Sequence, residues 1–129
     1  SIGYTSYVPH LHTDPVRHKD VTPAQVDQID RTAVTSSALA IVVSDNPSLG
    51  TGIETEMAHH ANVPVILVCH KDVVNARRLS RLVRGNPAVR AEVIYSDQDE
   101  ALRMIQEAIL SWEAGQKNGI LPEILQPSK

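Results

Sequence analysis

The feature that most constrains this sequence is a glycine-containing segment, residues 46–58, which lies between two short apolar runs. The runs, residues 39–43 and 63–69, are rich in β-branched residues and bounded by turn-forming ones, which predicts two buried strands. A helical pattern precedes the second run, so the order strand, loop, helix, strand predicts a βαβ unit with a right-handed connection. The loop of such a unit lies at the carboxyl end of its strand, where open α/β sheets bind ligands.

The residues of this loop indicate a particular chemistry. Gly50 and Gly52 would let the backbone approach a ligand closely, and Ser48 adds a hydroxyl beside helix amides that favour an anion. We expect Glu54 in the first turn of the helix, where the dipole keeps a carboxylate ionised. Phosphate-like recognition beside an ionised Glu54 favours attack on, or stabilisation of, a cationic sugar carbon. The alternative is that Glu54 simply follows a helix start, as many glutamates do.

Two well-known phosphate-binding motifs are excluded for this segment. It lacks the Gly-Lys-Ser/Thr of a P-loop, and Thr55 stands where the third glycine of a dinucleotide fingerprint would be.

The run Pro-Ser-Leu-Gly-Thr-Gly-Ile-Glu at residues 47–54, followed by Ala58, resembles the active-site segment of the nucleoside 2-deoxyribosyltransferase family. That family includes the nucleoside 5′-monophosphate N-glycosidases. The resemblance covers most of residues 4–95, and it implies that Glu54 is the nucleophile at C1′ and that Ser48 contacts a substrate phosphate. The chain departs from the family at Glu56, where a glycine is usual, and this adds a negative charge near the predicted site.

A second carboxylate precedes the segment on a predicted helix. Thr22 is a good N-cap, Pro23 suits the first helical position, and Gln25 completes a capping box. Asp30 follows on this helix, and from the sequence alone it would be a surface residue. The resemblance implies instead that Asp30 holds the sugar hydroxyls and orients the nucleophile.

The loop of residues 9–20 contains three histidines. His10 and His12 alternate and so share a face in an extended chain, and with Asp14 they could bind a metal. The alternative is that the histidines hydrogen-bond locally or touch substrate. The resemblance favours substrate contact, with His10 nearest the preceding strand.

Residues 72–84 follow a helical pattern and contain four arginines. The arginines form either a solvated helix face or a phosphate-binding cluster, for which the bidentate guanidinium is well suited. Residues 79–85 also resemble a segment of the monophosphate hydrolases in which a serine reaches the phosphate in the neighbouring subunit's site. The resemblance therefore implies that Ser80 binds substrate and that the protein forms a homodimer or a higher homo-oligomer. Arg84, from the arginine cluster, is a further candidate for binding substrate.

The whole chain of 129 residues fits one domain. The resemblance implies a flavodoxin-like α/β sandwich of three layers around a parallel sheet. Residues 4–8 would form the family's second strand, so the family's first strand and helix are expected to be missing from this chain. Residues 91–95 predict the last strand and residues 97–115 a long helix; we place the domain at residues 1–117 and a C-terminal tail at residues 118–129.

Composition narrows the classes of partner. A net charge of −3 without a basic run argues against nucleic acid, and no apolar stretch approaches the length of a membrane span. The lone Cys69 lies in a predicted strand, which fits a reducing cytoplasm.

These patterns lead to a functional hypothesis and two alternatives. We expect cleavage of the N-glycosidic bond of a nucleoside or nucleoside 5′-monophosphate, by hydrolysis or 2-deoxyribosyl transfer, with no metal or organic cofactor. One alternative is a module that binds a nucleotide and senses it without turnover, which the glutamate at position 56 favours. Another is a structural fragment that binds nothing.

Overall fold

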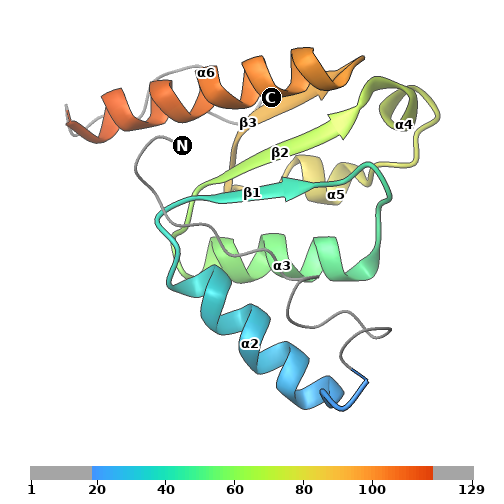
Figure 1. The fold of residues 1–129 in the computed structure, drawn as a ribbon, viewed down its shortest axis with the longest axis vertical. Coiled ribbons are helices and arrows are strands. Elements are labelled where there is room, and N and C mark those ends of the chain that lie inside the picture. The colour runs from blue at the N-terminus through green and yellow to red at the C-terminus, as the bar shows by residue number, and fades with distance from the viewer. Residues whose placement is uncertain (1–18, 118–129) are drawn as a thin grey trace.

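The computed structural model describes residues 19–117, and its centre is a parallel sheet with strand order β1-β2-β3 (Figure 1). The strands are β1 (Ala40–Val43), β2 (Val65–His70) and β3 (Val89–Tyr95). All the strand pairs are parallel, as the predicted βαβ connections require. The strands expected at residues 39–43, 63–69 and 91–95 are confirmed, and β3 begins at Val89 rather than at residue 91.

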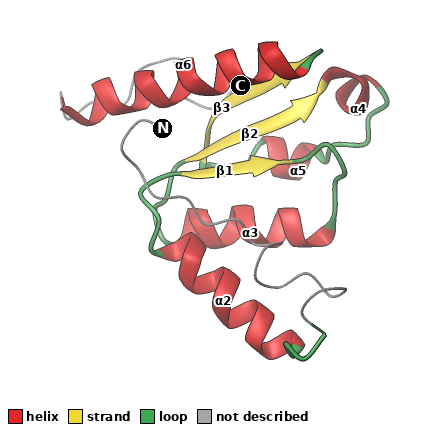
Figure 2. Ribbon diagram, in the orientation of Figure 1, coloured by secondary structure: helices red, strands yellow, loops and turns green. Residues whose placement is uncertain are grey.

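Helices lie on both faces of the sheet, which makes this an α/β sandwich of the flavodoxin-like type (Figure 2). The helix α6 (Gln98–Lys117) covers one face, and α3 (Leu49–His60) covers the other. The helix α2 (Pro23–Thr35) lies against α3, on the side away from the sheet. Two short helices, α4 (Lys71–Asn75) and α5 (Arg81–Arg84), connect β2 to β3.

The predicted start of α2 is confirmed in detail. The Thr22 hydroxyl accepts a hydrogen bond from the Gln25 backbone N–H, and the Gln25 side chain accepts one from the Thr22 N–H at 2.8 Å. This reciprocal capping box satisfies two of the amides that a helix start leaves without partners.

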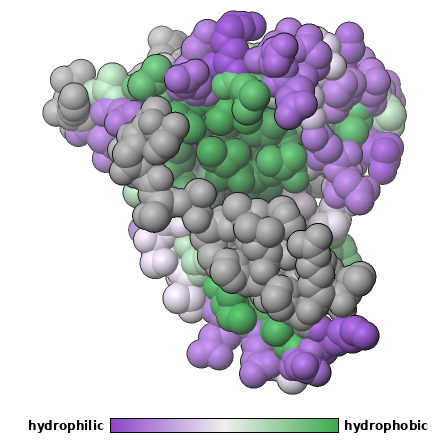
Figure 3. Space-filling view, in the orientation of Figure 1, coloured by the Kyte–Doolittle hydropathy of each residue, from purple (hydrophilic) through white to green (hydrophobic). Residues whose placement is uncertain are grey.

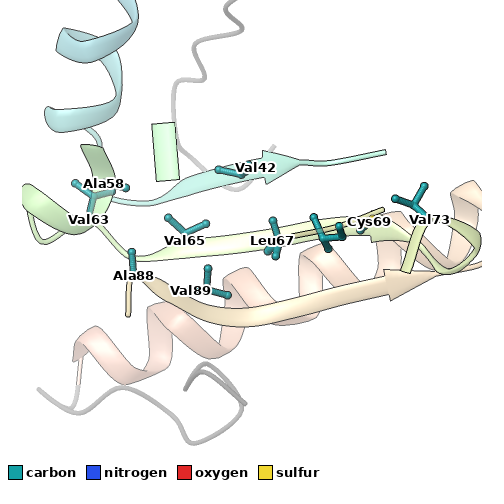
Figure 4. Close-up of a cluster of buried hydrophobic side chains, with 10 residues drawn as sticks. Val42, Ala58, Val63, Val65, Leu67, Cys69, Val73, Ala88 and Val89 are labelled. Carbon is teal, nitrogen blue, oxygen red and sulfur yellow. The ribbon is translucent and has the colours of Figure 1, made fainter. Parts of the chain in front are cut away.

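The strand β2 is buried on both faces and divides the core into two clusters. Val65, Leu67 and Cys69 pack toward α3 with Val42 and Ala58 (Figure 4). On the other face, a second cluster joins β2 and β3 to α6, and it consists of Ile66, Val68, Ala91, Val93, Ala108 and Trp112. A central strand that is buried on both faces reads as a continuous apolar run, which explains the composition of residues 65–69.

A β-bulge interrupts the pairing of β2 with β3. Val65 pairs with Val89 and Ile66 pairs with Ala91, so Arg90 is the extra residue. As a result Val89 packs in the cluster beneath α3, whereas Ala91 packs in the cluster beneath α6.

The predicted continuous helix over residues 72–84 is wrong. α4 ends at Asn75, and Arg77 adopts a positive φ of 57°, which a helix cannot continue through. The Arg78 N–H then bonds to the Val73 carbonyl at 3.0 Å, which closes the helix end. Ser80 begins α5 by accepting a hydrogen bond from the Leu82 N–H. The apolar residues are spaced as in a helix, but the chain changes direction at Arg77, between α4 and α5.

Several predictions fall outside the described residues: the strand at residues 4–8, the histidine loop up to residue 18, and the tail at residues 118–129. None of the helices in residues 19–117 is long and apolar enough to cross a bilayer.

Candidate functional site

The glycine-containing segment forms a helix start rather than an extended loop. Ser48 is the N-cap of α3, and its hydroxyl accepts a hydrogen bond from the Thr51 N–H at 3.3 Å. Gly50 and Gly52 therefore lie inside α3, and Glu54 lies in the second turn, which corrects the expected first-turn position. The helix begins early because Ser48 is a strong cap and Pro47 precedes it.

Glu54 and Asp30, the predicted catalytic pair, are brought together from separate helices. Both are half-buried, and α2 packs against α3 where they meet. Burial raises the pKa of Glu54, and the negative charge of Asp30 raises it further. Glu54 lies beyond the first turn, on which the helix dipole mainly acts, and its pKa is raised rather than lowered.

Glu56, the residue at which the chain departs from the family pattern, lies on a different side of α3 from Glu54. Its carboxylate accepts a hydrogen bond from the Asn86 side-chain amide at 3.1 Å, in the turn after α5. Residues two apart on a helix point about 200° apart. The charge of Glu56 is consequently directed away from Asp30 and Glu54.

Two predicted phosphate ligands line one hollow at the amino-terminal end of α3. The hollow has a volume of about 410 Å³, and Ser48, Thr51, Arg78 and Ser80 supply its polar groups. Leu49, Leu79 and Val83 supply much of its apolar lining. Hydroxyls and a guanidinium beside the start of a 12-residue helix form an environment that favours an anion.

Arg78 lines this hollow, although Arg84 was the arginine predicted to bind substrate. Arg84 is not among the residues that line the hollow. Arg84 forms an ion pair with Glu92 on β3, with a distance of 2.8 Å between Nε and Oε2. Arg84 thus holds α5 to the sheet. Arg78 directly follows Arg77, whose positive φ lies just beyond the end of α4, and it lines the hollow. The sequence shows the cluster of arginines, but it does not show that the chain changes direction at Arg77.

The glycines of α3 are not required by close packing. A Cβ at Gly50 would lie 3.6 Å from the Ser48 Oγ, and a Cβ at Gly52 would lie 3.8 Å from Val83, both ordinary contact distances. Gly50 is exposed and precedes Glu54 by one helical turn, so the two share a face. Because Gly50 has no side chain, the surface of α3 is open between its amino terminus and Glu54.

His10 lies outside the described residues, as does the possible metal set of His10, His12 and Asp14. Among residues 19–117, no group of three or more His, Cys, Asp or Glu side chains is placed to hold a metal ion.

The fold and these side chains define an α/β protein with a paired-carboxylate site beside an anion-favouring hollow. Comparison of the chain with known protein families, with curated proteins and with solved structures found no match.

Proposed function

We propose that this protein cleaves the N-glycosidic bond of a nucleoside 5′-monophosphate, with Glu54 as the nucleophile. The observation that carries the proposal is the pairing of the half-buried Glu54 with Asp30; burial, and then the charge of Asp30, raise the pKa of the Glu54 carboxyl. The resemblance at residues 47–54 supports it, because the same glutamate is the family's nucleophile.

The pairing has a direct chemical consequence. Two carboxylates held close together repel each other, and a cationic sugar carbon placed between them relieves that repulsion. Attack of Glu54 on C1′ then forms an ester, removes the Glu54 charge and releases the base. Asp30 keeps its charge and holds the sugar hydroxyls. Water or a second base resolves the ester, as in retaining glycosidases, where one carboxylate forms the covalent intermediate.

The position of the hollow supports a phosphorylated substrate. Thr51 lines the hollow and lies three residues before Glu54, so the two are neighbours on the helix surface. A substrate would lie across the first turn of α3, with its phosphate at Ser48 and Ser80 and its C1′ over Gly50, toward Glu54. Ser48 and Ser80 line one hollow of a single chain, so a phosphate site of this kind does not depend on a neighbouring subunit. We also propose a homodimer, because residues 79–85 resemble a segment that contributes to the neighbouring subunit's site in the monophosphate hydrolases.

The test is release of free base from a panel of nucleoside 5′-monophosphates and nucleosides, with and without an acceptor base. We expect release from the monophosphates by the wild-type protein and its loss in Glu54→Gln. Glu56→Gln is the matched control, since it makes the same change on the other side of the same helix. Arg78→Ala should raise KM for the monophosphates and leave release from nucleosides unchanged.

Either of two results would refute the enzyme. Saturable nucleotide binding without release of base would show a sensing module. Equal activity in Glu54→Gln and the wild type would show that Glu54 is not the nucleophile.

A further inference from the structure

A second group of polar side chains lies at the carboxyl ends of the strands, outside the Glu54 site. Asp45 follows β1, His70 ends β2 and Tyr95 ends β3, so each neighbouring strand contributes one residue. The carboxyl ends of parallel strands meet at one edge of the sheet, which is where α/β folds hold ligands. These residues are 25 and 50 positions apart along the chain, so no local sequence motif joins them.

Hydrogen bonds fix the position of the Asp45 carboxylate. Its Oδ1 accepts a hydrogen bond from the His70 backbone N–H at 2.8 Å, and its Oδ2 accepts one from the Tyr95 hydroxyl. The Tyr95 ring in turn contacts the His70 ring edge to face, with centroids 5.2 Å apart. A carboxylate offers about four acceptor positions, and these bonds occupy two of them. Asp45 is therefore oriented and still has acceptor capacity.

The imidazole of His70 is already engaged. Its Nδ1 accepts a hydrogen bond from the Asp72 N–H at 3.0 Å, so Nε2 carries the proton and donates it to the Ser96 carbonyl at 2.9 Å. His70 thus serves as a support for Asp45 and Tyr95 and leaves Asp45 as the group available to a ligand.

Asp45 and Tyr95 open into a hollow of about 450 Å³ on the α6 side of the sheet, a volume typical of small-molecule sites. Val43 and Val68 form its floor, and Ala101 and Ile105 of α6 line it as well. Val43 is 57% exposed, although it lies on the sheet face that α6 covers at β2 and β3. Apolar side chains gather below α6 in the space-filling view (Figure 3).

The charge of the hollow restricts the ligand. Of the described residues that line it, Asp45 is the one with a formal charge, and no arginine or lysine is among them. An anionic ligand would be repelled, whereas an ammonium group would form a charge-assisted hydrogen bond with Asp45. The valines and Ile105 would contact an apolar body attached to it.

We infer that this hollow is a second small-molecule site, which binds a small amine with an apolar body through the Asp45 carboxylate. It differs from the Glu54 site in position, because it lies on the α6 side of the sheet, and in the sign of its ligand's charge. The inference does not depend on glycosidase activity.

The test uses phenethylamine as the probe and hydrocinnamate, an anion of similar size, as its counterpart, with binding measured by calorimetry on the whole chain. We expect saturable binding of the amine and binding of the acid at least about tenfold weaker, because a charge-assisted bond is replaced by repulsion. Asp45→Asn should weaken the binding of phenethylamine by about tenfold.

A second variant keeps the test valid if Asp45→Asn disturbs folding. Val43→Lys places a cation on the exposed floor of the hollow and should abolish amine binding. Ile53→Lys is its control, because Ile53 is similarly exposed, at 54%, on α3. Absence of saturable binding at millimolar amine, unchanged binding in Val43→Lys, or loss of binding in Glu54→Gln would each overturn the inference.

Discussion

Replacing Tyr95 by phenylalanine removes one hydroxyl and the hydrogen bond that it donates to Asp45 across the sheet. That bond, together with burial and the charge of Asp45, raises the pKa of Tyr95 from 10.0 to about 12. The difference corresponds to ~2.7 kcal/mol. Because the pair is only partly buried, screening by solvent reduces the expected contribution to about 1–2 kcal/mol. Tyr95→Phe should lower the free energy of unfolding by that amount at neutral pH.

The effect should depend on pH in one direction. Folding raises the pKa of Tyr95, so the stabilisation is fully present below the unfolded value of 10.0 and disappears as pH rises through about 12. The stability of the wild-type protein and of Tyr95→Phe should therefore converge in strong alkali and differ by a constant amount from neutral pH to about pH 9.

Urea unfolding of the wild type, Tyr95→Phe, Asp45→Asn and the double variant measures this contribution as a double-mutant cycle. We expect a coupling free energy of about 1 kcal/mol between the two side chains at neutral pH. A coupling below ~0.3 kcal/mol, which is the usual error of additivity, would refute the reasoning. So would a difference in stability that persists unchanged in alkali.

Four further predictions concern α3 and the core. Gly50→Ala should raise the free energy of unfolding by about 0.5–1 kcal/mol, because alanine is the better helix former and its Cβ fits. The same substitution should lower the rate of base release, because the added methyl group narrows the path of the substrate to Glu54. Glu54→Gln should raise stability at neutral pH, with the gain vanishing below pH 4.5, because folding raises the pKa of this carboxyl and so penalises its ionised form. Ser48→Ala should cost about 0.5–2 kcal/mol through loss of the cap. Leu67→Ala should cost about 2–5 kcal/mol, whereas Leu82→Ala, at a side chain that is 86% exposed, should change stability by less than ~0.5 kcal/mol.

Urea unfolding checks the stabilities, and the base-release assay checks Gly50→Ala. Higher activity in Gly50→Ala would contradict the proposed substrate path. A stability gain in Glu54→Gln that persisted in acid would mean that ionisation is not its cause. Equal losses in Leu67→Ala and Leu82→Ala would contradict the placement of the core.

Local patterns predicted the parts of the fold that local interactions determine. The Thr22 capping box involves residues three apart, and the buried strand at residues 65–69 is a run of apolar side chains, so each could be predicted without knowing the rest of the molecule. Local patterns also predicted the helices that carry Asp30 and Glu54, and the structure packs these two helices together.

The predictions failed where tertiary contacts decide. The pattern over residues 72–84 is helical throughout, and the reversal at Arg77 is stabilised by hydrogen bonds to Val73 and Val74 that periodicity does not reveal. The bond between Tyr95 and Asp45 joins residues 50 apart, and no spacing rule reaches that far. The ion pair between Arg84 and Glu92 joins α5 to β3, and the arginine pattern that suggested a phosphate-binding cluster does not reveal it.

The bulge at Arg90 decides which residues of β3 face which layer. Successive side chains of a strand alternate between faces, so in a regular strand Val89 and Ala91, two residues apart, would share a face; the extra residue lets Val89 point toward α3 and Ala91 toward α6. Deleting residue 90 would make Val89 and Ala91 successive residues of a regular strand, and each would keep both its partner on β2 and its face. Loss of this one residue should therefore be tolerated, whereas deleting a paired residue such as Glu92 would turn one part of the strand over relative to the other.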